Sequence, residues 1–152
     1  MLKSRLMFRF FILLALLSGC SSDETITKPV FLEARMRDSQ TDIEAVFLAA
    51  TASNAECQAR TALMMFSKCP TCRFTKVKCS DALPSHFQTV WNGNPYRATY
   101  MMFTHGQKGE RDGRLIFFRV PSSIVASACS LIEAKIREVY KGVIECRKGT
   151  VG

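Results

Sequence analysis

Apolar and polar residues alternate near the start of the expected domain. In residues 30–36 the even positions are apolar, while positions 33, 35 and 37 are charged, which is typical of a half-buried strand. Residues 38–42 are polar and predict a turn, and residues 43–50 predict a second strand, so the region is expected to form a β-hairpin. A competing interpretation makes Thr41 and Glu44 a capping box that starts a long helix. We prefer the hairpin.

Helical spacing follows this hairpin. Ser53 and Glu56 match the capping-box pattern and predict a helix from about residue 54 to 68. Pro70 is expected to end it, because proline disfavours the helical conformation of the residue before it. Residues 73–79 alternate again and predict a strand, whereas residues 80–95 contain several turn-forming residues and are expected to be irregular.

The second half of the chain predicts another hairpin and another helix. Residues 96–104 and 114–120 are β-prone runs joined by a polar, glycine-rich loop. The second run is apolar on both faces, which predicts a central strand. Ser122 or Ser123 is expected to cap a helix that runs to about Tyr140 and ends at Gly142, before a last short strand over residues 143–147.

These elements define an α+β fold. Two helices packed on one face of a largely antiparallel sheet would bury both helical stripes. The order of elements is compatible with a ferredoxin-like βαββαβ core with extra strands. No internal sequence repeat is evident, and residues 30–149 are expected to form a single domain, stabilised by disulfides.

The N-terminus has the organisation of a secretory signal. Lys3, Arg5 and Arg9 precede the apolar run 10–17, which is followed by small residues. A membrane-spanning helix would need roughly 18 or more unbroken apolar residues, and this run is shorter.

The sequence Leu17-Ser18-Gly19-Cys20 resembles a bacterial lipobox, the signature of lipoprotein precursors. The resemblance implies removal of residues 1–19 as a signal peptide and lipidation of Cys20, with palmitate among the attached chains. Two or more chains give stable anchoring, and residues 20–29 would form a flexible tether. Because Ser21 rather than aspartate follows Cys20, the outer membrane is favoured over the inner membrane, although a cell-surface location stays open.

Charge adds little to this localisation. The mature chain keeps 133 residues, of which 18 are basic and 13 acidic, a net charge of +5. This suits an anionic envelope environment and equally an ordinary soluble surface. No run of lysine and arginine predicts a nucleic-acid partner.

The cysteines predict a disulfide framework. Besides Cys20 there are six, an even number suited to an oxidising compartment: Cys57, Cys69, Cys72, Cys79, Cys129 and Cys146. If the intervening residues are extended, Cys72 and Cys79 lie about 20 Å apart, beyond the roughly 7 Å that a disulfide allows between Cα atoms. Cys79 should therefore pair with a distant cysteine, for which Cys57, Cys129 and Cys146 stay open.

The pair Cys69 and Cys72 carries the main alternative, a thiol-disulfide or metal-handling lipoprotein. Catalytic pairs of this spacing need a thiolate stabilised at a helix N-terminus, whereas this pair follows the C-terminus of a predicted helix. Together with Cys79 and His86 it would offer four zinc ligands. The oxidising compartment favours structural disulfides, so we expect neither a metal nor a cofactor.

One loop suggests a ligand. Trp91, Asn92, Asn94 and Tyr96 combine aromatic rings with amides, as many sugar-binding sites do. The simpler interpretation is a turn whose rings cover the core. No nucleophile elbow or paired base predicts catalysis. The sequence therefore predicts an envelope lipoprotein with a binding or structural role, whose partner is another envelope protein or a cell-wall glycan.

Overall fold

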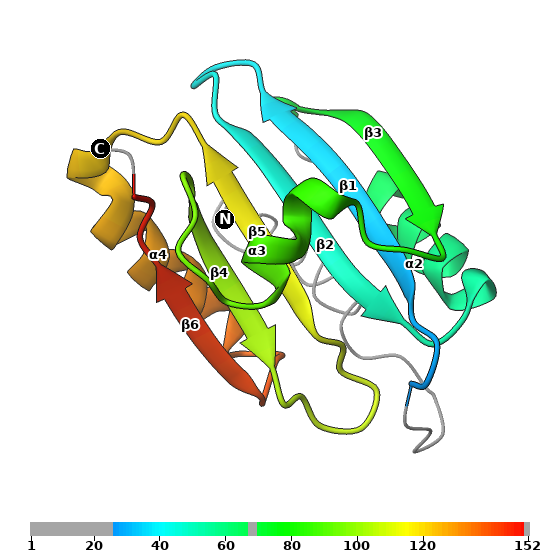
Figure 1. Ribbon diagram of the computed structural model, residues 1–152. Coiled ribbons are helices and arrows are strands. Elements are labelled where there is room, and N and C mark those ends of the chain that lie inside the picture. The colour runs from blue at the N-terminus through cyan, green and yellow to red at the C-terminus, as the bar shows by residue number, and fades with distance from the viewer. Residues whose placement is uncertain (1–25, 67–69, 151–152) are drawn as a thin grey trace, which may run out of the picture.

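The computed structural model describes residues 26–66 and 70–150. Within them the fold is α+β, with a six-stranded sheet in which every neighbouring pair of strands is antiparallel (Figure 1). The expectations for the signal peptide, Cys20 and Cys69 lie outside the described residues.

The first half of the chain forms a ββαβ unit. The expected hairpin is confirmed as β1 (Val30–Asp38) and β2 (Glu44–Thr51), which are followed by α2 (Asn54–Phe66) and β3 (Cys72–Ser80). The competing helix at Thr41 and Glu44 is wrong, because Glu44 is the first residue of β2 and pairs with β5.

The second half repeats this topology. It consists of β4 (Thr99–Thr104), β5 (Gly113–Phe118), α4 (Ser122–Ile136) and β6 (Val143–Arg147). In both units the third strand pairs with the first, and the two second strands pair with each other, which gives the order β3-β1-β2-β5-β4-β6. The strand β5 is central, as its apolar sequence predicts. The chain thus has a repeated topology that its sequence does not reveal.

This order differs from that of a ferredoxin-like core. In that core two split βαβ units interlock, so that each contributes the strand lying between the strands of the other. Here the crossover from β2 to β3 encloses β1, and the crossover from β5 to β6 encloses β4. The two crossovers lie side by side, so the ferredoxin-like arrangement is absent.

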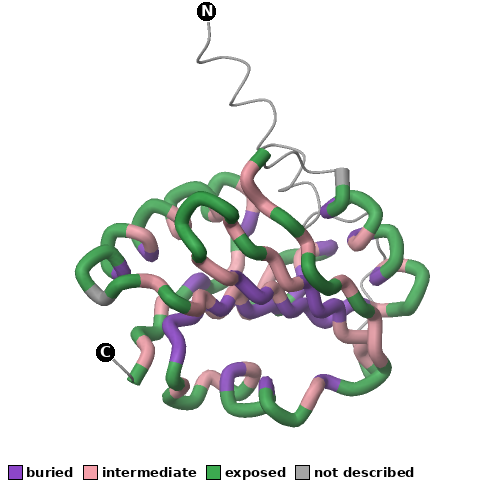
Figure 2. The backbone as a smooth tube through the Cα atoms, turned by 90° about the horizontal axis from the view of Figure 1, so that it is seen from above, coloured by how far each residue is buried: buried purple, intermediate pink, exposed green. Residues whose placement is uncertain are grey.

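The sheet is covered on both faces. The helices α2 and α4 lie on one face, as expected, and a short helical segment lies on the other (Figures 1 and 2). This segment consists of η1 (Ser85–Phe87) and α3 (Gln88–Trp91) and corrects the irregular structure expected for residues 80–95. Phe87 and Val90 are buried against the sheet. Their burial stabilises these helical turns, which are too short to show a periodic pattern in the sequence.

The core is divided by the sheet. The clusters beneath α2 and α4 are separate, and Phe47 of β2 packs against both. On the opposite face a single cluster lies beneath α3 and comprises Val46, Leu48, Leu83, Phe87, Val90, Ala98, Tyr100 and Ile116. Both central strands therefore have apolar side chains on both faces.

Several boundaries differ from the expectations. The helix α4 has Pro121 at its N-cap without a side-chain hydrogen bond, so the expected serine cap is wrong. It ends at Ile136, before Tyr140, whose ring is buried against Phe103 with 5.8 Å between centroids. The strand β5 ends at residue 118 because Arg119 adopts a φ of 61°, which is incompatible with an extended strand.

A buried arginine holds α3 on the sheet. Arg114 of β5 is only 4% exposed. Its guanidinium donates hydrogen bonds to the carbonyl oxygens of Val90 (3.2 Å), Phe103 (3.3 Å) and Gly113 (2.7 Å), and also to that of Trp91. The guanidinium carbon lies 4.8 Å from the centroid of a Trp91 ring. Backbone carbonyls and an aromatic face thus surround this cation.

We expect Arg114→Met to lower the free energy of unfolding by about 3 kcal/mol, because it removes the hydrogen bonds that the guanidinium donates to four carbonyl groups and its contact with Trp91. Urea unfolding followed by circular dichroism and by the fluorescence of Trp91, the sole tryptophan, measures the effect. Arg73→Met, at an exposed position of β3, is the control. A loss no larger than that of the control would contradict the structural role of Arg114.

Candidate ligand-binding cleft

A cleft opens at one end of the sheet. It lies where β2 and β4 begin and β5 and β6 end, beside the first turns of α4, and its volume is about 840 Å³. That volume lies in the range of small-molecule sites. The charged and aromatic residues of its lining are Arg35, Glu44, His86, Phe87, Tyr96, Arg97, Phe117, Phe118, Arg119 and Lys148.

The lining has an excess of positive charge. Arg35 lies 2.8 Å from Glu33 and 3.8 Å from Glu44, and Arg119 lies 3.0 Å from Asp42. These two arginines are therefore compensated by carboxylates. The other two cations are considered separately below.

Arg97 and Lys148 form no ion pair with any carboxylate in residues 26–66 and 70–150. The guanidinium carbon of Arg97 lies 5.9 Å from the ring centroids of both Tyr96 and Phe118. Two half-buried rings therefore flank this cation.

The segment after β6 brings Lys148 to the cleft. The N–H of Gly149 donates to Thr99 Oγ1 (3.0 Å), and the N–H of Thr150 donates to the carbonyl of Tyr96 (2.8 Å). A Cβ atom on Gly149 would lie 2.8 Å from the carbonyl oxygen of Arg97, so this close approach requires glycine. Residues 96–99 and 148–149, which are about 50 positions apart in the sequence, therefore form one wall of the cleft.

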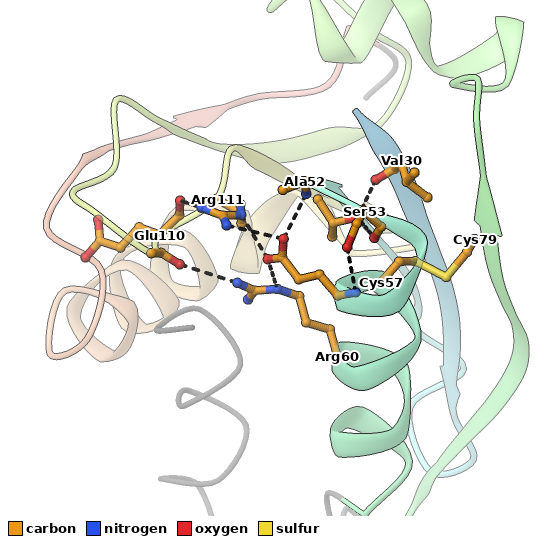
Figure 3. A network of polar contacts seen from close by, with 11 residues as sticks. Val30, Ala52, Ser53, Cys57, Arg60, Cys79, Glu110 and Arg111 are labelled. Carbon is orange, nitrogen blue, oxygen red and sulfur yellow. Dashed lines mark hydrogen bonds and ion pairs between the residues drawn. A yellow bond between two sulfur atoms is a disulfide. The ribbon is translucent and has the colours of Figure 1, made fainter. Parts of the chain in front are cut away.

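The opposite end of the sheet carries a network of polar contacts (Figure 3). Ser53 caps α2 there as expected, with the N–H of Glu56 donating to Ser53 Oγ (3.1 Å), whereas the other half of the expected capping box is shifted by one residue. The Glu56 carboxylate accepts from the N–H of Ala52 (2.8 Å). It also lies 2.7 Å from Arg60 and 2.9 Å from Arg111.

The loop 105–112 between β4 and β5 supplies Arg111 to this network, and its Gly109 carbonyl accepts from Arg60 (3.3 Å). The loop therefore covers the start of α2. Its topological equivalent in the first unit is the shorter turn 39–43 between β1 and β2. No residue of that turn lines the cleft, and the corresponding space beside α4 is open.

The network lowers the pKa of the Glu56 carboxyl group. Burial alone raises the pKa of Glu56, but hydrogen bonds from Arg111, Ala52 and Arg60 outweigh burial and leave this pKa below its ordinary value of 4.5. A carboxylate with a lowered pKa stabilises the fold at pH values above the ordinary pKa, and this contribution is lost as the pH falls through the lowered value.

We therefore expect Glu56→Gln to reduce stability at pH 7 by about 2 kcal/mol and to flatten the loss between pH 5 and pH 3. Urea unfolding at a series of pH values measures both effects. Glu138→Gln, which changes an exposed carboxyl group, should leave the profile unchanged. Parallel profiles for wild type and Glu56→Gln would contradict the assignment.

The cysteines form structural bridges in each unit. Cys57 of α2 is bonded to Cys79 of β3, with 6.1 Å between Cα atoms, which settles the alternatives left open for Cys79. Cys129 of α4 is bonded to Cys146 of β6, with 6.0 Å between Cα atoms. Cys72 is also disulfide-bonded.

These bonds bear on the zinc alternative. Cys79 has no thiolate to offer while it is bonded to Cys57, so the four-residue set that includes Cys69, Cys72 and His86 does not assemble. Within residues 26–66 and 70–150, no group of three or more potential metal-ligating side chains comes together.

The structure separates the residues of the predicted ligand loop. Trp91 packs at its edge against Phe31, with 5.2 Å between centroids, and lies over Arg114. Asn92 and Asn94 are exposed, and only Tyr96 lines the cleft. The sequence interpretation missed Arg97 and Lys148, although the adjacency of Arg97 to Tyr96 was an available signal.

Comparisons with protein-family models, with curated proteins and with solved structures find no match to this chain. Among the described residues, no helix has the length and apolar character needed to cross a membrane.

Peptide mapping without reduction should find Cys57 linked to Cys79 and Cys129 linked to Cys146. Replacing Cys57 and Cys79 together by alanine should lower the free energy of unfolding by about 3 kcal/mol, because a bond of this span restricts the unfolded chain. The matched control replaces Cys129 and Cys146 and should have a similar effect, since the span is similar. Links between the two units would contradict this topology.

Proposed function

We propose that this chain is the precursor of a cell-envelope lipoprotein that is anchored through lipid on Cys20 and acts by binding rather than by catalysis. The cleft beside α4 is its ligand site. The partner is a cell-wall glycan, and the outer membrane, facing the periplasm, is the favoured location.

The observation that carries the binding role is the cleft itself. It combines two cations that have no carboxylate partner in the described chain, Arg97 and Lys148, with half-buried rings of Tyr96 and Phe118. Sites with a few convergent polar groups against aromatic walls are typical of ligand recognition. The bonded state of every described cysteine supports an oxidising compartment, as the lipobox resemblance implies.

The alternative function is thiol-disulfide exchange at Cys69 and Cys72. Its support is that Cys72 is disulfide-bonded at an intermediate exposure. Mild reductant applied to the native protein separates the two functions. Rapid opening of the bond at Cys72, while the bonds of Cys79 and Cys146 persist, would favour exchange over a purely structural role.

Lipidation is tested in bacterial cells by labelling with palmitate and by membrane fractionation. The wild-type protein should incorporate label and sediment with membranes, because two or more acyl chains give stable anchoring. Cys20→Ala should lose both properties. Ser21→Ala is the matched control and should keep them. Label that persists in Cys20→Ala would contradict the proposed anchor.

A further inference from the structure

We infer that the cleft binds a carboxylate-bearing saccharide, with a sugar carboxylate held between Arg97 and Lys148. This inference rests on the proposed function and specifies the chemical class of its ligand. Its support is the charge of the cleft, the rings that flank the charge, and the position of the cleft in the domain.

The charge of the cleft selects an anion. Of the four arginine and lysine side chains in the lining, Arg35 and Arg119 already contact carboxylates. Arg97 and Lys148 are both exposed and retain their full hydrogen-bonding capacity towards a ligand. An arginine presents a planar fork that matches a carboxylate, and a lysine adds a mobile point charge.

The backbone holds these two cations near one another. The strands β4 and β6 are paired, with Tyr100 opposite Arg147. After β6, the N–H of Gly149 donates a hydrogen bond to Thr99 Oγ1, and Gly149 lies close to the carbonyl oxygen of Arg97. Lys148 therefore lies next to the segment that carries Arg97, and the spacing between the two depends on sheet pairing rather than on a flexible tail.

The aromatic side chains select a ligand with a flat apolar surface next to its charge. Tyr96 and Phe118 are half-buried and flank Arg97 at equal distances of 5.9 Å. A sugar ring offers an apolar face for such rings, while its carboxylate and hydroxyl groups project from the edge. A free inorganic anion would use the cations and leave the rings uncovered.

The location of the cleft argues against the headgroups of the anchoring membrane. Val30, which follows the tether, pairs with Thr51 at one end of β2, and Glu44 lines the cleft at the other end. Seven residues of strand separate these ends, about 24 Å. The cleft therefore lies at the end of the sheet opposite to the point where the tether enters the domain, which favours polymers elsewhere in the envelope over the headgroups of the anchoring membrane.

The test is calorimetric titration of the purified mature protein with trigalacturonate, an oligosaccharide with a carboxylate on each ring. We expect a dissociation constant below about 1 mM. Arg97→Ala with Lys148→Ala should weaken binding about tenfold or more. The matched control, Arg73→Ala with Lys78→Ala, removes the same charge from exposed positions of β3 at the far edge of the sheet and should bind as wild type does.

Three results would overturn the inference. The first is equal weakening in the control, which would show that only net charge matters. The second is equal binding of the neutral sugar maltotriose, which would exclude a role for the cations. The third is binding of inorganic phosphate without binding of trigalacturonate, which would exclude a saccharide.

Folding of the variants is checked by circular dichroism. If the double variant in the cleft unfolds, Lys148→Ala alone tests the site, because this residue is exposed, and it should weaken binding about threefold. The palmitate experiment on Cys20 is independent of this titration. A failure of sugar binding with an intact lipid label would therefore overturn the ligand class and leave the anchor in place.

Discussion

Pairing between β2 and β5 joins the two halves of the molecule. Each half is a three-stranded sheet covered by one helix, and β2 and β5 are the second strand of each. The pair lines up Val46 with Ile116 on one face and Phe47 with Leu115 on the other. Because side chains alternate across a strand, this one register aligns the cores on both faces.

In each half the edge strand is linked covalently to the helix. Each outer strand, β3 or β6, follows a helix and pairs with the first strand of its unit. The connection from the second strand to the outer strand is therefore long. A disulfide from α2 to β3, and another from α4 to β6, fixes each helix to its edge strand. Each of these bonds stabilises the fold by restricting the unfolded chain.

Local patterns predicted the elements better than their arrangement. Alternation identified β1, the polar turn after it delimited β2, and the Ser53–Glu56 pair located the start of α2, because these signals act over a few residues. The order of strands depends on contacts between residues far apart, which a period of two does not encode. The burial of Arg114 was equally hidden, because its partners are backbone carbonyls of α3 and β4. The cleft residue Lys148 was missed for the same reason, since strand pairing brings it beside Arg97.

The cleft follows from a difference between two loops. Both units would leave a space beside the first turn of their helix, where the preceding strand ends. The loop 105–112 fills this space at α2, and Arg111 and Arg60 balance the charge of Glu56 there. The equivalent turn 39–43 is shorter, and α4 has no acidic residue in its first turn. A nearly symmetric scaffold thus has one end closed by its own ion pairs. The other end presents Arg97 and Lys148, which form no ion pair with a carboxylate of the described residues.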